Sequence, residues 1–192
     1  DESDDARREQ VSPDGTRAFV VTRKGDVASD RNRYEIRLLD LAPERLAAQR
    51  VPAPVTVFSV AVGHDNNDFR PAIQDVRWQG NRTLVFLGRL EGESSQVYSL
   101  DVDTRELAQL THERNLIVSY AASQDLRRVV YAAQVPNPPL RDGAHGVVVG
   151  SQSFWSVKFG QKDLVTQQRM YRFFVADAAS PTVSLSGSES AR

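Results

Sequence analysis

The chain contains no cysteine among its 192 residues. Disulfide bonds, zinc–thiolate sites and thiol catalysis are therefore excluded. The absence of thiols fits a reducing and an oxidising compartment equally well, so it leaves the localisation open.

The chain also lacks an excess of either charge. It has 24 basic and 25 acidic residues, for a formal net charge of −1. A surface without a broad field of one sign is not expected to attract nucleic acid or an anionic membrane. No apolar run approaches the roughly 20 residues that a transmembrane helix needs, so the sequence predicts no membrane span.

Sequence patterns that indicate catalysis are missing as well. No Gly-x-Ser-x-Gly motif is present, and the nearest string, beginning at Gly150, lacks its spacing. The three histidines are His64, His112 and His145. They lie far apart and open no zinc-binding motif. We therefore expect no catalytic residue, no metal and no cofactor in this chain, which would not act as an enzyme on its own.

The sequence does contain a threefold repeat. Each unit opens with a strand and a tight turn, continues with a β-branched and aromatic strand, and has a third strand that ends on an acidic residue. The turns are Ser12-Pro13-Asp14-Gly15, Gln79-Gly80-Asn81 and Ser123-Gln124-Asp125. Proline presets φ and glycine accepts positive φ in such turns. The alignment treats Asp14, Gly80 and Asp125 as equivalent positions.

The strands of the three units are short and alternate apolar with polar residues, as half-buried strands do. We predict strands at 17–24 and 34–41 in the first unit, at 73–80, 82–90, 96–103 and 106–111 in the second, and at 116–125, 127–134, 170–178 and 182–185 in the third. The acidic strand ends are Asp40, Asp101 and Asp177. A weak helix signal covers 43–48.

These units predict an all-β fold, a partial β-propeller of about three four-stranded antiparallel blades. The step of 45 residues from Gly80 to Asp125 matches one blade, which takes roughly 40–50 residues. The blades are expected at 11–72, 73–115 and 116–186, between an extension at 1–10 and a tail at 187–192. A β-sandwich with several hairpins is the alternative fold.

Several stretches resemble a known type of repeat. They are Val11-Ser12-Pro13-Asp14-Gly15 with the later Leu39-Asp40, and the run from Gln96 to Thr104 followed by Leu107-Ala108-Gln109-Leu110-Thr111. They resemble the propeller repeats of TolB-like proteins and of the prolyl-oligopeptidase family of serine peptidases. The segment 20–41 is similar to a first-blade insertion of the bacterial dipeptidyl- and acylaminoacyl-peptidase-like members.

The resemblance implies a noncatalytic domain that gates peptide access to a catalytic α/β-hydrolase domain absent from this chain. Its partners would be that hydrolase domain, in the parent or in another protein, and the parent's peptide substrate. A TolB-like module for protein–protein interaction in a bacterial envelope is the rival hypothesis, and a metal-dependent propeller enzyme is a third. The implied compartment is the periplasm or the cytoplasm of a bacterium, with the periplasm slightly favoured.

Two further expectations concern interfaces. The long insertion at 135–168 is either an extra hairpin or an arm that contacts a partner or covers a site, with Phe154, Trp155 and Phe159 as its apolar anchors. In a stack of three blades the outer faces of the first and last have no neighbour, so we expect exposed apolar surface there. The chain is therefore expected to self-associate or to be a fragment of a longer propeller.

Overall fold

The computed structural model describes residues 10–44, 53–63, 71–90, 94–135, 170–177 and 180–185. These residues form β-strands in three antiparallel sheets. The first sheet contains β1 (Arg17–Asp26), β2 (Arg31–Asp40) and β3 (Val55–Gly63). The second contains β4 (Ile73–Gln79), β5 (Thr83–Gly88), β6 (Gln96–Asp101) and β7 (Leu107–Gln109), and the third β8 (Leu116–Ala122), β9 (Arg128–Val135), β10 (Met170–Asp177) and β11 (Ser180–Leu185).

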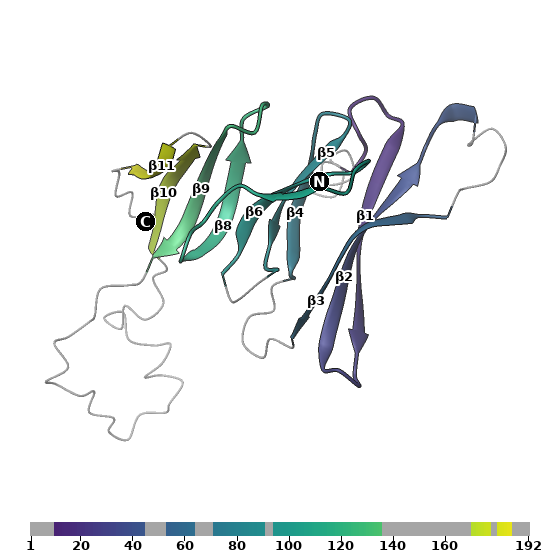
Figure 1. The fold of residues 1–192 in the computed structure, drawn as a ribbon, viewed down its shortest axis with the longest axis horizontal. Helices are drawn as coiled ribbons and strands as arrows, with labels where there is room; N and C mark the ends of the chain where they lie inside the picture. Colours follow the sequence, from purple (N-terminus) through teal and green to yellow (C-terminus); the bar gives the residue numbers. More distant parts are fainter. Residues whose placement is uncertain are drawn as a thin grey trace, which may run out of the picture.

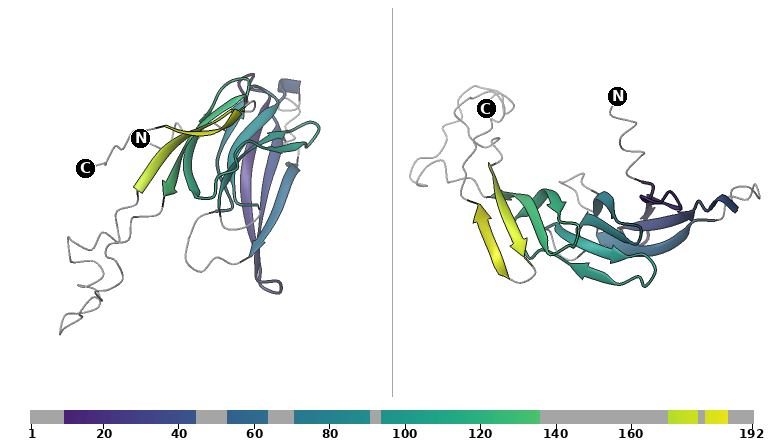
Figure 2. Two further views of the ribbon diagram at one scale, coloured as in Figure 1. Left: turned by 60° about the vertical axis from the view of Figure 1, so that its left-hand side comes forward. Right: turned by 90° about the horizontal axis from the view of Figure 1, so that it is seen from above.

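Each sheet is a meander in which strands that follow one another in the chain also pair. The sheets succeed one another along the molecule in chain order (Figures 1 and 2). This arrangement is a partial β-propeller and confirms the predicted all-β fold. Three sheets in succession, in place of two sheets facing each other, rule out the alternative sandwich.

Strand positions agree with the sequence-based prediction in the second and third sheets and differ in the first. There the described residues give three strands, because the predicted opening strand is reduced to one bridge between Val11 and Ala18. The strand β3 was not predicted, although Phe58, Val60 and Val62 alternate as a pleated strand requires and pack on the core. Of the weak helix signal, Pro43 and Glu44 are helical, and the rest lies outside the described residues. In the described part of the chain, no helix has the length and apolar character to span a membrane.

The second sheet is buried on both faces, between two hydrophobic cores. Alternate residues of β5 supply them: Leu84 and Phe86 belong to the core shared with the first sheet, and Val85 and Leu87 to the core shared with the third. All four side chains are at most 4% exposed. Because successive side chains point to opposite faces, a strand buried on both faces has an unbroken apolar sequence.

The second and third sheets are also joined by one side chain. The hydroxyl of Tyr120, on β8, lies 2.7 Å from the carbonyl oxygen of Asp75 and 2.8 Å from that of Val85. Asp75 has a φ of 49° and sits in a β-bulge of β4. The bulge thus presents its carbonyl to the neighbouring sheet, and the tyrosine connects the two sheets through polar contacts as well as apolar ones.

We predict that Tyr120→Phe lowers the free energy of unfolding by about 1 kcal/mol, because the buried carbonyl contacts lose their hydroxyl partner while the ring stays in place. Urea denaturation of both proteins measures the difference. Tyr171→Phe is the matched control, since Tyr171 is 41% exposed and the same change there should be nearly neutral. Equal losses in the two variants would contradict the role given to Tyr120.

Candidate interaction surface

The first turn of the repeat is held by a short network of polar contacts. The Ser12 hydroxyl lies 2.7 Å from Asp14 Oδ1 and accepts the Arg17 amide at 3.0 Å. The same aspartate oxygen accepts the amide of Thr16 at 3.0 Å. The turn side chains therefore satisfy the backbone groups that no strand partner reaches.

The third turn repeats this network atom for atom. The Ser123 hydroxyl lies 2.6 Å from Asp125 Oδ1 and accepts the Arg128 amide at 3.0 Å, and Asp125 Oδ1 accepts the Arg127 amide at 3.1 Å. Two turns with little common sequence beyond serine and aspartate thus have one structure. This equivalence is direct evidence that the units are repeats.

The second turn is shorter by one residue. Three residues separate Gln79 from its strand partner Thr83, but four separate Ser12 from Arg17. The left-handed positions of the three turns are Gly15 (φ 72°), Gly80 (φ 72°) and Leu126 (φ 58°). Gly80 thus has the left-handed backbone of Gly15 and Leu126. Counted back from the paired residues Arg17, Thr83 and Arg128, Gly80 nevertheless stands at the position of Asp14 and Asp125, as the sequence predicted, and the left-handed residue is displaced by one position in the shorter turn.

The three turns contact one another in a row, which we call the turn row. The amide of Asp14 donates to Asn81 Oδ1 of the second turn at 3.1 Å. The second turn reaches the third through Gln79, whose Nε2 donates to the carbonyl oxygen of Ser123 at 3.2 Å. The sheets are thus linked at this edge by hydrogen bonds in addition to their shared cores.

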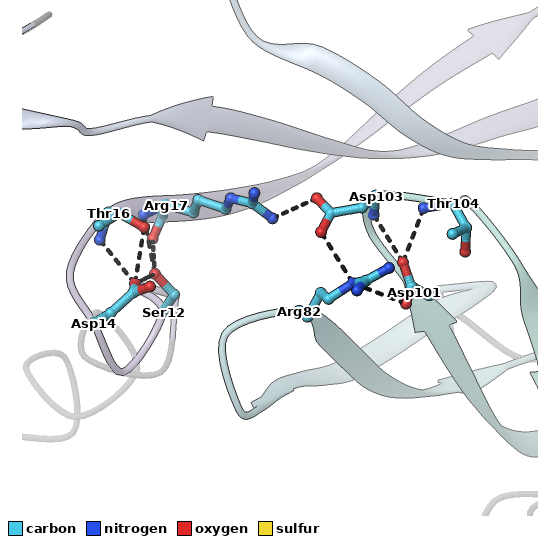
Figure 3. A network of polar contacts seen from close by, with 8 residues as sticks. All are labelled: Ser12, Asp14, Thr16, Arg17, Arg82, Asp101, Asp103 and Thr104. Carbon is cyan, nitrogen blue, oxygen red and sulfur yellow. Dashed lines mark hydrogen bonds and ion pairs between the residues drawn. The ribbon is translucent and has the colours of Figure 1, made fainter.

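An arginine–aspartate network adjoins the turn row (Figure 3). Arg82 Nε lies 3.2 Å from Asp101 Oδ2 and 3.0 Å from Asp103 Oδ2. Arg17 of the first sheet reaches the same Asp103, with 2.8 Å between Nη1 and Oδ1. These side chains are 29–59% exposed, so each pair contributes little stability by itself. The contact between Arg17 and Asp103 crosses from the first sheet to the second unit.

The third sheet has its own version of the pair, between Arg128 Nε and Asp177 Oδ2 at 3.2 Å. A basic residue at the start of the second strand thus meets the acidic residue that ends the third strand. The sequence had identified Asp101 and Asp177 as strand ends but not their arginine partners. The signal was available, since Arg82 directly precedes the second strand of its sheet and Arg128 begins the second strand of its own.

Hydrogen bonds lower the pKa of several aspartates in and beside the turn row. The Ser12 hydroxyl, with the Thr16 amide, lowers the pKa of Asp14 below its usual 3.8. The Ser123 hydroxyl and the Arg127 amide do the same for the pKa of Asp125. For Asp101 the Thr104 backbone amide is the main cause of a lowered pKa. Each interaction favours the charged form because an ionised carboxylate is the better acceptor.

The stability of the protein is therefore predicted to fall on acidification. A carboxyl whose pKa is lower in the folded chain than in the unfolded chain stabilises the fold above the unfolded value of 3.8. That contribution disappears as the pH falls from there through the folded pKa. Urea midpoints should be flat near neutral pH and decline below about pH 4.

In the double variant Asp14→Asn/Asp125→Asn, the urea midpoint should fall less steeply below about pH 4. Asparagine does not titrate, so the two turns no longer bind protons differently in the folded and the unfolded chain. Asp30→Asn is the control, since no side-chain hydrogen bond of Asp30 occurs in the described part of the chain. An unchanged acid slope in the double variant would show that the turn carboxylates are not responsible.

A small pocket lies between the second and third sheets, away from the turn row. Its volume is about 190 Å³, and Gln74, Arg89, Ser95 and Tyr171 are among its lining residues. Pockets that hold small-molecule ligands are usually about 300–1,000 Å³. This pocket is too small for a peptide, and the candidate surface of the molecule is the turn row with its arginine–aspartate network.

Several residues singled out in the sequence lie outside the described residues. They are Phe154, Trp155, Phe159, His64 and His145. The third histidine, His112, has its Nδ1 3.1 Å from Gln109 Nε2 at the end of the second unit. Over the described ranges, no group of three or more metal-ligating side chains occurs. The turn row brings together carboxylates, amides and guanidinium groups that bind one another, which suits a scaffold or a docking surface.

No protein-family model matches the chain, and no curated protein matches it. Solved structures do. AtxE2 isopeptidase matches with a TM-score of 0.59 at 14% identity, over 92% of this chain and 28% of that one. TolB from Acinetobacter baumannii matches with a TM-score of 0.47 at 14% identity, over 91% of this chain and 31% of that one. An acylaminoacyl peptidase from Pyrococcus horikoshii matches with a TM-score of 0.47 at 12% identity, over 88% of this chain and 23% of that one.

The likeness to AtxE2 isopeptidase supports the fold, and the two scores of 0.47 are too low to add to it. The chain spans less than a third of each of these three structures. At this level of identity the agreement concerns architecture, because one fold serves many functions. The comparison with AtxE2 isopeptidase thus supports the propeller fold.

Proposed function

We propose that this chain is a noncatalytic part of the propeller domain of a prolyl-oligopeptidase-like serine peptidase. In this proposal it restricts the access of peptides to a catalytic α/β-hydrolase domain that the chain does not contain. Bond cleavage belongs to that domain, and the work of this chain is steric. The described residues contribute rigidity to it, and none of them is assigned a chemical step.

The observation that carries the proposal is the continuous packing and hydrogen bonding between successive sheets. A steric filter must resist opening when a large substrate presses on it. Here the second sheet shares a core with each neighbour, and the turn row and Tyr120 add hydrogen bonds across both junctions. The repeats that resemble peptidase propellers and the shared fold with AtxE2 isopeptidase support the peptidase class.

The first experiment is to sequence the gene beyond residue 192. A downstream Gly-x-Ser-x-Gly followed by alternating strands and helices is the expected result. A reading frame that stops shortly after this point would overturn the proposal in favour of a TolB-like binding module.

A second experiment tests the filter in the full-length peptidase. Tyr120→Phe loosens the junction of the second and third sheets, so we expect kcat/KM to rise for long peptides and to stay unchanged for a dipeptide substrate. Tyr171→Phe should leave both values unchanged. If Tyr120→Phe changes the two substrates by the same factor, the sheets do not act as a filter.

A further inference from the structure

The hairpin of β1 and β2 is longer than the corresponding hairpins of the other sheets. Its strands have ten residues each, whereas β5 and β6 have six and β9 and β10 have eight. When the pair Arg17–Asp40 is aligned with Thr83–Asp101, the last four of its ten pairs lie beyond the ladder of the second sheet. This extension, residues 23–34, projects past the neighbouring sheet (Figures 1 and 2), and we call it the arm.

The arm is basic and exposed to solvent. It contains four cationic residues and two carboxylates, a balance of +2 in a chain whose net charge is −1. The cations Arg23, Lys24, Arg31 and Arg33 are all exposed. At the tip Val27 is 98% exposed. The arm therefore offers a cationic surface that the rest of the described chain does not cover.

The cations of the arm have no acidic partners, in contrast to the arginines beside the turn row. There Arg17, Arg82 and Arg128 each bind an aspartate at 2.8–3.2 Å. Within the described ranges, none of the four arm cations forms an ion pair. Lys24 even stands directly opposite Arg33 in the ladder. Like charges at directly opposite positions destabilise a strand pair.

The two carboxylates of the arm do not relieve this repulsion through an ion pair. Asp26 stands opposite Arg31, but its Oδ1 accepts the Ala28 amide at 3.1 Å and its Oδ2 accepts the Ser29 hydroxyl at 2.7 Å. The turn at the tip thus holds this carboxylate. Asp30 follows in the same turn with a φ of 50°. A charge arrangement that costs stability without a compensating contact in the fold is typical of a functional surface.

The outer edge of β1 is also free along the arm. The amide of Phe19 points away from β2, since it donates to the carbonyl oxygen of Gln10 at 2.9 Å. Backbone groups alternate in direction along a strand, so the amides and carbonyls of Arg23 and Gly25 point away from β2 as well. In the described part of the chain no backbone hydrogen bond reaches them. Residues 10–12 already pair with the base of this edge, which shows that an extended segment fits it.

We propose that the arm binds an extended acidic segment of a partner protein. The segment pairs antiparallel with the outer edge of β1, so that its backbone satisfies the free groups of Arg23 and Gly25. Consecutive carboxylates of the segment then lie on opposite faces, one beside Arg23 and the next beside Lys24. The unpaired cations select acidic side chains, and the free backbone selects a polypeptide over a phosphate polyanion. This binding site goes beyond the proposed function and does not depend on it.

Fluorescence anisotropy of a short labelled peptide, in which Glu-Glu pairs alternate with Val-Thr pairs, tests the site on the full chain. We expect binding at low ionic strength that weakens with added salt, because the contacting charges are exposed. The same peptide with glutamine in place of each glutamate should not bind. Equal binding of the two peptides would contradict the proposal.

Lys24→Glu separates binding from stability. It reverses one charge of the site, so the acidic peptide should bind several-fold more weakly. It also places an acidic residue opposite Arg33, so the urea midpoint should rise or stay unchanged. Arg114→Glu is the control, because it changes the net charge equally on an exposed side chain between β7 and β8. If both variants weaken binding by the same factor, the arm is not the site.

Gly25→Pro tests the backbone pairing while every charge stays in place. Proline removes an amide that points away from β2, and an edge strand tolerates it there. Binding of the acidic peptide should be lost. If this variant binds as tightly as the unmodified chain, or if an oligonucleotide binds more tightly than the peptide, the arm recognises charge alone and the proposal is wrong. A dimer in sedimentation that Lys24→Glu dissociates would assign the arm to a second copy instead.

Discussion

Phe86→Ala is expected to lower the free energy of unfolding by about 3–5 kcal/mol, because it deletes a fully buried aromatic ring and leaves a cavity. Phe86 stacks on Tyr98 within the second sheet and lies 5.7 Å from the ring of Phe58 in the first. The substitution therefore removes contacts inside a sheet and between two sheets at once. Urea denaturation followed by tryptophan fluorescence measures the loss.

Phe173→Ala is the matched control for this prediction. It removes the same atoms from a ring that is 47% exposed, so the expected change is small, within about 1 kcal/mol. If both substitutions destabilise the chain equally, the third sheet is covered in solution by something that the described residues do not include. If neither does, the core between the first and second sheets is not the stabilising centre of the fold.

Gly88→Val is expected to destabilise the protein by about 1–3 kcal/mol through overpacking. A Cβ atom at Gly88 would lie 2.8 Å from Cδ2 of Tyr98 and 3.0 Å from Cε2 of Phe86. Both rings are buried and stacked on each other, so they cannot move aside without disturbing the core. The glycine at this position is thus required by the space that the aromatic pair occupies.

Gly63→Val in β3 is the control, because a Cβ atom there would meet no atom within 4 Å. Valine favours a strand, so this variant should be neutral or slightly stabilised. Thermal and urea unfolding of the two variants provide the comparison. A neutral Gly88→Val would mean that the rings of Phe86 and Tyr98 have room to shift, contrary to the tight packing described above.

The strand positions of the second and third units followed from the sequence because their determinants are local. Val85 and Phe86 lie in an apolar run bounded by turn residues, and Asp101 closes its strand with an Asx turn that accepts the amides of Asp103 and Thr104. The same local chemistry fixed the turns at Asp14 and Asp125. Prediction was less successful in the first unit, where β3 follows a stretch without a turn signal of the repeat type.

The candidate surface was predictable only in part. The acidic strand ends were visible in the sequence, but Arg17 shows why their partners were not. Arg17 stands opposite Asp40 in its own sheet, yet it bridges to Asp103 of the neighbouring sheet. Pairing of charges across sheets depends on how closely the two turns approach, and no spacing along the chain encodes that distance.

The sequence by itself determined the all-β class, the repeat, most strand positions and the residues of the turns, because backbone propensity and period-two alternation act over a few neighbouring residues. Only the tertiary structure decided which face of each sheet meets which neighbour. Val85 and Phe86 are adjacent and equally apolar, yet they enter different cores. That assignment depends on the direction in which successive sheets stack, which is a property of the whole assembly and not of either strand.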